Sequence, residues 1–261
     1  MCSWNLLEDL KVHSLYLDQF KRSLSIMKKD ILIYYLKGPV IIFGVLIPLF
    51  LFLAFLTGSK NLSTDFLISG LIGMTMLFTA TSVSPVIIPW ESQMKTLERL
   101  MACPISIHTL IMGDMLASVL FGFFISLVPV LIGLALDVIP IHTLVLVMGI
   151  GLASLCFSSL GLLLATPPTN APSNVMMISS LIKFPLVFIS GIFIPLESMP
   201  FWGKIIASLS PLTYFTDITR YSLQNVSYYP IWLDFLAIIL FTLMFFVLAV
   251  KIHKKTLAMR I

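Results

Sequence analysis

The histidines and cysteines of the chain are scattered rather than clustered. Metal sites and redox pairs need such residues at short fixed spacings, as in C-x-x-C or H-E-x-x-H, and neither spacing occurs here. We therefore expect no metal ion, and we interpret the histidines as isolated polar residues. The residues concerned are His13, His108, His142, His253, Cys2, Cys103 and Cys156.

Motifs for nucleotide binding and for covalent catalysis are missing as well. The sole Gly-Lys pair, Gly203-Lys204, is followed by Ile rather than by Ser or Thr, so there is no phosphate-binding P-loop. The G-x-S-x-G pattern of a nucleophilic serine is also absent. We predict that this chain has no catalytic residue, and that it binds neither ATP through a P-loop nor any other cofactor.

Lys183 is the one charged residue between positions 138 and 196. A lysine in an apolar setting is costly unless it is paired or reaches a polar boundary. Two interpretations stay open. Lys183 faces a transport pathway and attracts an anionic group, or its long stem reaches an interface or pairs with a carboxylate elsewhere.

Asp217 and Arg220 are three positions apart and can share one helix face, where they are able to pair. Other acidic residues within the apolar part of the chain lie near the ends of charge-free stretches, namely Asp114, Asp137 and Asp234. Carriers driven by protons or sodium keep carboxylates deep in the bilayer. The sequence therefore argues against an ion-coupled carrier.

The elements that position these residues are predicted to be membrane-spanning helices. The chain has 261 residues, of which 59% are hydrophobic and 11% charged, and soluble domains have about 25% charged residues. A bilayer core about 30 Å thick needs about 20 apolar helical residues. The prolines of the TPPTNAPSN stretch, 166–174, divide the longest charge-free run. We predict an all-α polytopic protein with six spans at 38–57, 66–89, 111–136, 143–165, 175–195 and 231–250.

Lysine and arginine predict the orientation of these spans. Twelve of the sixteen basic residues fall in 1–37, 91–109 and the tail 251–261, which lie on one side of a six-span chain. Both termini are therefore predicted to face the cytoplasm. The net charge of +4 suits the anionic lipids of an inner leaflet rather than nucleic acid.

The N-terminal segment 1–37 has the pattern of an amphipathic helix. Its apolar residues recur at steps of three, four or seven, and charged residues lie largely off that stripe. Such a helix rests in the membrane interface, or it forms a soluble cap on the cytoplasmic loops. The stripe consists of Leu6, Leu10, Leu17, Phe20, Leu24 and Met27.

The cytoplasmic loop 91–109 contains a predicted short helix around Gln93–Met101 that ends before Pro104. Leu97, Leu100 and Met101 share one of its faces. An amphipathic helix between two spans is suited to docking another protein. The alternative is a helical turn lying on the membrane surface.

The outer segment 196–230 is too apolar for a solvated loop and too interrupted for a span. It is broken at Pro200, Gly203, Pro211 and Pro230, and it is rich in aromatic residues that suit the lipid headgroup zone. We predict one or two short helices that dip into the outer leaflet or lie on it. The alternative is a capped outer loop.

The fifth span leads into this segment through Pro185, Gly191 and Pro195, so we expect that span to be kinked or broken.

Two sets of residues resemble the motifs of ABC-2 type transporter permeases. The first is E…TLERL…P-[IV]-S and the second is roughly F-P-x-x-x-x-S-G-x-x-x-P-[LI]…[ML]-P…P-[LF]-T-Y…D…R. The chain is most similar to the branch of drug-resistance and lipo-oligosaccharide exporters. The matching residues are Glu91, Thr96, Leu97, Glu98, Arg99, Leu100, Pro104, Ile105 and Ser106, followed by Pro185, Ser190, Gly191, Pro195, Leu196, Met199, Pro200, Pro211, Leu212, Thr213, Tyr214, Asp217 and Arg220.

The resemblance implies a multi-pass permease subunit in the cell membrane, acting as an exporter. Two permease subunits, expected to be identical, pair with two copies of a separate ABC ATPase that holds ATP and Mg²⁺. The helix of 91–109 is then the coupling helix that inserts into the ATPase, and the N-terminal helix also contacts it. The outer segment is re-entrant and closes the extracellular end. The implied substrate is an amphipathic drug, lipid or lipid-linked glycan.

The sequence departs from the family pattern at two positions. The family often has Gly before the Thr-Leu pair, where this chain has Lys95, and a basic residue after Gly113, where this chain has Asp114. The sequence also bears on two rival functions. A lipid-modifying membrane enzyme needs clustered polar residues at one membrane face, and we find none. An ATP-independent assembly or channel-like protein would not need a docking helix.

Overall fold

The computed structural model describes residues 18–58, 63–103, 105–169 and 171–256. Within these ranges the chain is helical and contains no strand. Residues 18–30 are helical and continue into a short π-helical turn, Ile31–Tyr35. Leu6, Leu10 and Leu17 of the predicted N-terminal stripe lie outside the described residues, and so does Pro104.

The helices follow one another with short connections. They are α2 (Gly38–Gly58), α3 (Thr64–Ala80), α4 (Ser84–Gln93), α5 (Thr96–Met101), α6 (Ile107–Ala135), α7 (Thr143–Leu164), α8 (Pro172–Ile189), α9 (Phe201–Ser208), α10 (Pro211–Gln224) and α11 (Ile231–Thr256), with a 3₁₀ turn at Leu196–Ser198.

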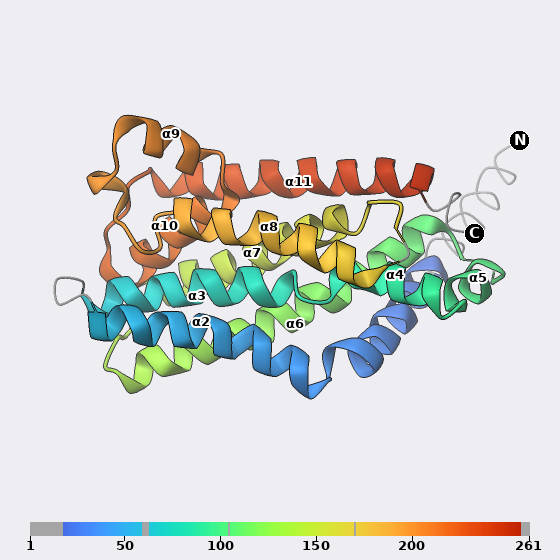
Figure 1. The fold of residues 1–261 in the computed structure, drawn as a ribbon. Helices are drawn as coiled ribbons and strands as arrows, with labels where there is room; N and C mark the ends of the chain where they lie inside the picture. Colours follow the sequence, from blue (N-terminus) through green and yellow to red (C-terminus); the bar gives the residue numbers. More distant parts are fainter. Residues whose placement is uncertain (1–17, 59–62, 104, 170, 257–261) are drawn as a thin grey trace, which may run out of the picture.

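The long helices run side by side, with α5 at one end of the bundle and α9 at the other (Figure 1). In the described part of the chain, five helical stretches are long and apolar enough to cross a membrane. They are Thr64–Gln93, Ile107–Ala135, Thr143–Leu164, Pro172–Ile189 and Ile231–Thr256. The prediction of a polytopic α-helical membrane protein is confirmed. A sixth span, which would be the 21-residue α2, stays a prediction.

α3 forms the centre of the bundle, because nearly all of its residues are buried and it packs against α2, α6, α7 and α10. The outer helices instead leave large apolar side chains exposed, for example Phe124 of α6, Leu181 of α8 and Leu240 of α11. In water such a surface would be unusual, whereas in a bilayer it contacts lipid tails.

The predicted span 66–89 is not one continuous helix. α3 ends at Ala80 and α4 begins at Ser84. Pro85 has no N–H, so it cannot donate to the carbonyl of Thr81, four residues earlier, as a helix requires. Side chains from other helices bond the carbonyls at this break. Ser118 Oγ donates to Ala80 O at 2.6 Å, and Lys183 Nζ donates to Thr81 O at 3.1 Å.

The helical residues 18–30 lie against the start of α6. A Cβ built at Gly113 of α6 would be only 2.6 Å from Cβ of Ile26 and 3.0 Å from the backbone oxygen of Ser23. Ile26 is buried by this contact, while Phe20 and Leu24 stay exposed. The N-terminal helix is therefore held by close backbone packing at Gly113.

Gly113→Ala should destabilise this contact, because a buried methyl group without space costs about 1–3 kcal/mol. We expect the midpoint of thermal unfolding in detergent to fall by about 5 °C. Gly151→Ala is the matched control, since a Cβ at Gly151 of α7 meets nothing within 4 Å. Equal midpoints for the two variants would contradict the proposed packing.

Candidate functional site

α5 is anchored to the bundle through one leucine. Leu97 is 1% exposed and packs in a buried cluster with Ile26 of the N-terminal helix, Ile88 of α4 and Leu110 of α6. Leu100 and Met101 are partly buried against the same cluster. The apolar face of the helix predicted to dock another protein thus packs against the N-terminal helix, α4 and α6 of its own chain.

The outward face of α5 is charged. Glu98 and Arg99 are exposed, and Met94, just before α5, has 67% of its surface exposed. Thr96 lies between these faces, and its Oγ1 donates to the carbonyl of Glu91 at 3.1 Å. Of the predicted coupling residues, Glu98 and Arg99 therefore point away from the bundle, whereas Leu97 is buried beneath them.

Lys95, the residue immediately before α5, has left-handed backbone angles with φ 53° and ψ 22°. For an L-residue with a side chain this conformation costs roughly 1–2 kcal/mol, and glycine adopts it freely. The glycine that the resemblance to ABC-2 permeases implies at this position would make this turn without strain. In this chain Lys95 makes the same sharp turn between α4 and α5.

Lys29 connects the N-terminal helix to the end of α4. Its ammonium donates to Glu91 Oε1 and lies 2.9 Å from Asp30 Oδ1. Burial by itself lowers the pKa of Lys29, but the carboxylates of Asp30 and Glu91 outweigh burial and hold its pKa above the ordinary value. Lys29 therefore stays protonated at physiological pH. Asp114, the second departure from the family pattern, is fully buried on α6 beside Asp30.

At the other end of the bundle, Asp217 of α10 binds backbone rather than Arg220. Its carboxylate accepts the N–H of Tyr228 at 2.9 Å and the N–H of Tyr229 at 2.8 Å. These bonds fix the connection between α10 and α11. The predicted Asp217–Arg220 pair on one helix face is thus replaced by separate partners for each residue.

Arg220 joins α10 to the turn that follows α8. Its guanidinium donates to the carbonyl of Gly191 and lies 4.1 Å from the centre of the Phe66 ring of α3. Gly191 has φ 79°, which favours glycine, and its backbone turns the chain away from α8. α8 ends at Ile189, so the chain leaves the helix earlier than the predicted limit of 195.

The prolines of the outer segment mark where its helices begin. Pro195 precedes the 3₁₀ turn, Pro200 precedes α9 and Pro211 opens α10, while Pro185 lies inside α8. Tyr214 Oη donates to Ser208 O at 2.8 Å and ties α10 to the end of α9. α10 is buried among the long helices, whereas α9 exposes Phe201 and Trp202.

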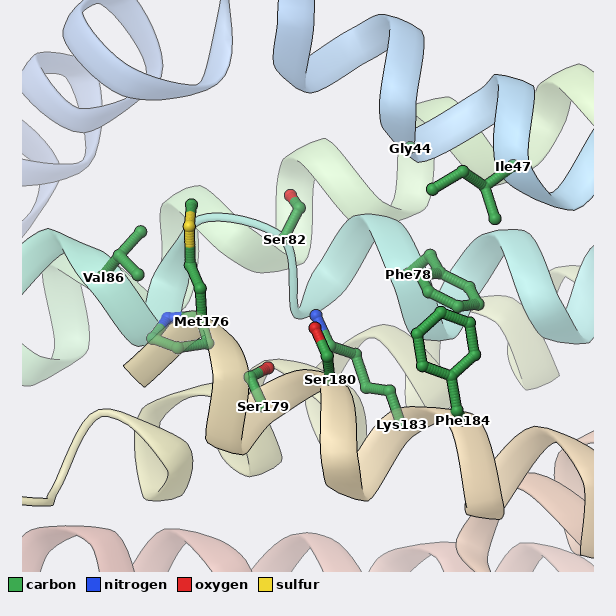
Figure 2. Close-up of a pocket in the computed structure, with 11 residues that line it drawn as sticks. Gly44, Ile47, Phe78, Ser82, Val86, Met176, Ser179, Ser180, Lys183 and Phe184 are labelled. Atoms are coloured by element: carbon green, nitrogen blue, oxygen red, sulfur yellow. The ribbon is translucent and has the colours of Figure 1, made fainter. Parts of the chain in front are cut away.

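Lys183 points from α8 toward the linker between α3 and α4 (Figure 2). It is 8% exposed, and its partner is the Thr81 carbonyl rather than a carboxylate or an interface. It also lines a cavity of about 220 Å³ between α2, α8 and the break, together with Phe78, Ser82 and Ser179. The sequence singled out Lys183 but gave no signal for its partner, which is 102 positions away.

These features are those of a polytopic helical membrane protein, and comparison with known proteins shows its family. The family model described as "ABC-2 type transporter" matches residues 22–224. The chain belongs to the ABC-2 type transporter family. It is similar to the "Inner membrane transport permease YadH" of Escherichia coli K12 and of Shigella flexneri, with 22% identity over 198 residues, which cover 75% of this chain and 77% of either relative.

The ABC-2 chain is therefore a transmembrane transport permease. The matched region begins inside the N-terminal helix and ends with α10, so it contains both α5 and the Arg220–Gly191 joint. Sequence reasoning named Glu91, Gly191 and Arg220 individually. It missed Lys29 and the break at 81–83, for which Pro85 was the available signal.

Lys95→Gly should stabilise the ABC-2 permease by up to about 1 kcal/mol, since glycine relieves the left-handed strain but adds unfolded-state entropy. We expect the thermal midpoint to rise by about 3 °C. Lys95→Ala removes the same charge but keeps the strain, so it serves as the control. A rise with alanine as large as with glycine would show that charge, not backbone geometry, limits stability here.

Proposed function

We propose that this permease is the membrane subunit of an ATP-driven exporter in the plasma membrane. Two identical copies would pair with a separate ABC ATPase, which holds ATP and Mg²⁺ on its own chain. Both termini and α5 would face the cytoplasm. The inner-membrane naming of the E. coli relative and the Lys and Arg bias of the loops support this placement.

The position and anchoring of α5 carry the proposal. α5 presents Glu98 and Arg99 outward, while Leu97 fixes it to the N-terminal helix, α4 and α6. A partner that pushes on α5 would therefore displace several helices together. α4 leads through the break at 81–83 to α3, and Lys183 links the break to α8. ATP-driven closure of the partner would in this way tilt the helices that line the path.

At the outer end, α9 and α10 would form the re-entrant segment that closes the path to the outside. α10 is buried, and Arg220 holds it against the turn at Gly191. Opening would require α10 and the end of α8 to separate or to move together. The substrate would be an amphipathic drug, lipid or lipid-linked glycan that enters between or beside the two permease copies.

The double variant Glu98→Lys with Arg99→Glu tests the coupling role. In a mild-detergent pull-down of the tagged permease from its native membrane, wild type should bring down a P-loop ATPase in near-stoichiometric amount. The double variant should lose most of that ATPase, because both exposed charges of α5 change sign. Leu97→Asp is unsuitable for this purpose, since Leu97 is buried and its loss disrupts the fold.

Lys254→Glu is the matched control, because Lys254 is an exposed basic residue near the end of α11 and does not belong to α5. It should retain the ATPase. Equal recovery of the ATPase with wild type and with the double variant would contradict docking through α5. Absence of any ATPase from an intact wild-type preparation would favour the ATP-independent alternative.

A further inference from the structure

The ammonium of Lys183 has spare hydrogen-bonding capacity. Among the residues that the structure describes, no carboxylate lies within 4 Å of it. It has three N–H donors, and the hydrogen bond described for it is the one to Thr81 O at 3.1 Å, while its ammonium also lies 5.9 Å from the centre of the Phe78 ring. A charge inside the bilayer without a counter-ion is strongly unfavourable. An anion at this position would neutralise the charge of Lys183 and accept hydrogen bonds from its remaining N–H donors.

A second polar group next to Lys183 also lacks a partner. Ser179 lies one helical turn before Lys183 on α8, is 2% exposed, and its Oγ has no hydrogen-bond partner within the described chain. Both residues line the same cavity, which Ser82 and Ser180 also border (Figure 2). A hydroxyl and an ammonium side by side can both donate to the oxygens of a carboxylate or phosphate.

The remaining walls of the cavity are apolar. Phe78 of α3 and Phe184 of α8 pack edge to face with ring centres 5.8 Å apart, and Ile47 of α2 and Met176 of α8 also line the cavity. A cavity of about 220 Å³ accommodates a small head group with its first carbon atoms, but not a whole amphiphile.

An apolar hollow on the surface of α8 continues from this cavity. It shares Ser180 and Phe184 with the cavity and extends along Met177, Leu181 and Pro185. Met177 and Leu181 are 60% and 67% exposed, so this surface is free within the chain to contact an alkyl tail. A polar, positively charged recess thus adjoins an elongated apolar surface.

We propose that the cavity at Lys183 binds the anionic head of an amphiphile, while the tail lies along α8. The head is a carboxylate or a phosphate that accepts hydrogen bonds from Lys183 and Ser179. This inference deepens the proposed export function and rests on it, because it assigns the transported substrate to the anionic amphiphiles. Neutral and cationic amphiphiles lack the group that the two donors require.

The test uses the full-length chain in nanodiscs of phosphatidylcholine, with a photoactivatable palmitate and its methyl ester as probes. Titration of the labelling of α8 gives the apparent Kd of each probe. In the wild type the acid should bind about tenfold more tightly than the ester, since it adds charge-assisted hydrogen bonds. Because no ATPase is needed, a negative result here leaves the pull-down result unaffected, and the reverse also holds.

Variants of Lys183 and Ser179 distinguish two roles of Lys183, which are binding the anion and donating a hydrogen bond to the Thr81 carbonyl at the break. Lys183→Gln keeps an N–H donor for Thr81 but removes the charge, so binding of the acid should weaken about tenfold while the ester is unchanged. Lys183→Arg should retain preference for the acid. Ser179→Ala removes a hydroxyl that has no hydrogen-bond partner among the described residues, so the fold is expected to tolerate it, and acid binding should weaken about threefold. Lys251→Met, at an exposed site on α11, is the control and should behave as wild type.

Equal binding of acid and ester in the wild type would overturn the proposal, and so would unchanged acid binding in both Lys183→Gln and Ser179→Ala. Adding phosphatidylglycerol to the nanodiscs separates two sources of the anion. Displacement of the palmitate supports a lipid phosphate as the occupant. If phosphatidylglycerol leaves palmitate binding unchanged and that binding still depends on Lys183, the result supports a single-chain carboxylate as the occupant.

Discussion

Every backbone polar group inside a bilayer must find a partner within the protein, and the break between α3 and α4 is where this constraint is most demanding. Pro85 leaves the carbonyl of Thr81 without its helical donor. Lys183 of α8 donates to that carbonyl, and Ser118 of α6 donates to Ala80 beside it. Ser158 of α7 donates in turn to Ser118 at 2.8 Å. α6, α7 and α8 therefore meet the break between α3 and α4 at one polar point.

This polar point lies between two anchored ends. At one end, Leu97 and the Lys29–Glu91 contact join α5 to the N-terminal helix and to α4. At the other, Arg220 joins α10 to the turn at Gly191, and Thr219 Oγ1 donates to Ser69 O of α3 at 3.3 Å. A continuous series of packed elements thus runs from α5 through α4 and α3 to α10. Such a series is the physical requirement for movement at one end to reach the other.

The sequence predicted the helical, membrane-embedded class because charge-free runs of sufficient length have few other solutions. It also predicted that α5 is amphipathic, but a pattern alone does not say which protein covers the apolar face. Leu97 faces its own chain, which only packing reveals. The partners of Glu91, Lys183 and Arg220 lie 62, 102 and 29 positions away in the chain, so spacing rules that operate within one helix do not reach them. Pro85 could have indicated the break at 81–83, because proline removes a helical donor wherever it falls, but the predicted span 66–89 ran through it.

Photo-crosslinking in the native membrane tests most directly whether this permease is driven through α5. A photoreactive amino acid replaces Met94, which is 67% exposed beside α5, or Trp202, which is 68% exposed on α9 at the opposite end. We expect position 94 to form a covalent adduct with a P-loop ATPase, identified by mass spectrometry, and position 202 to form none. An ATPase adduct from position 202, or none from position 94 in a membrane that retains other intact ABC complexes, would contradict coupling through α5.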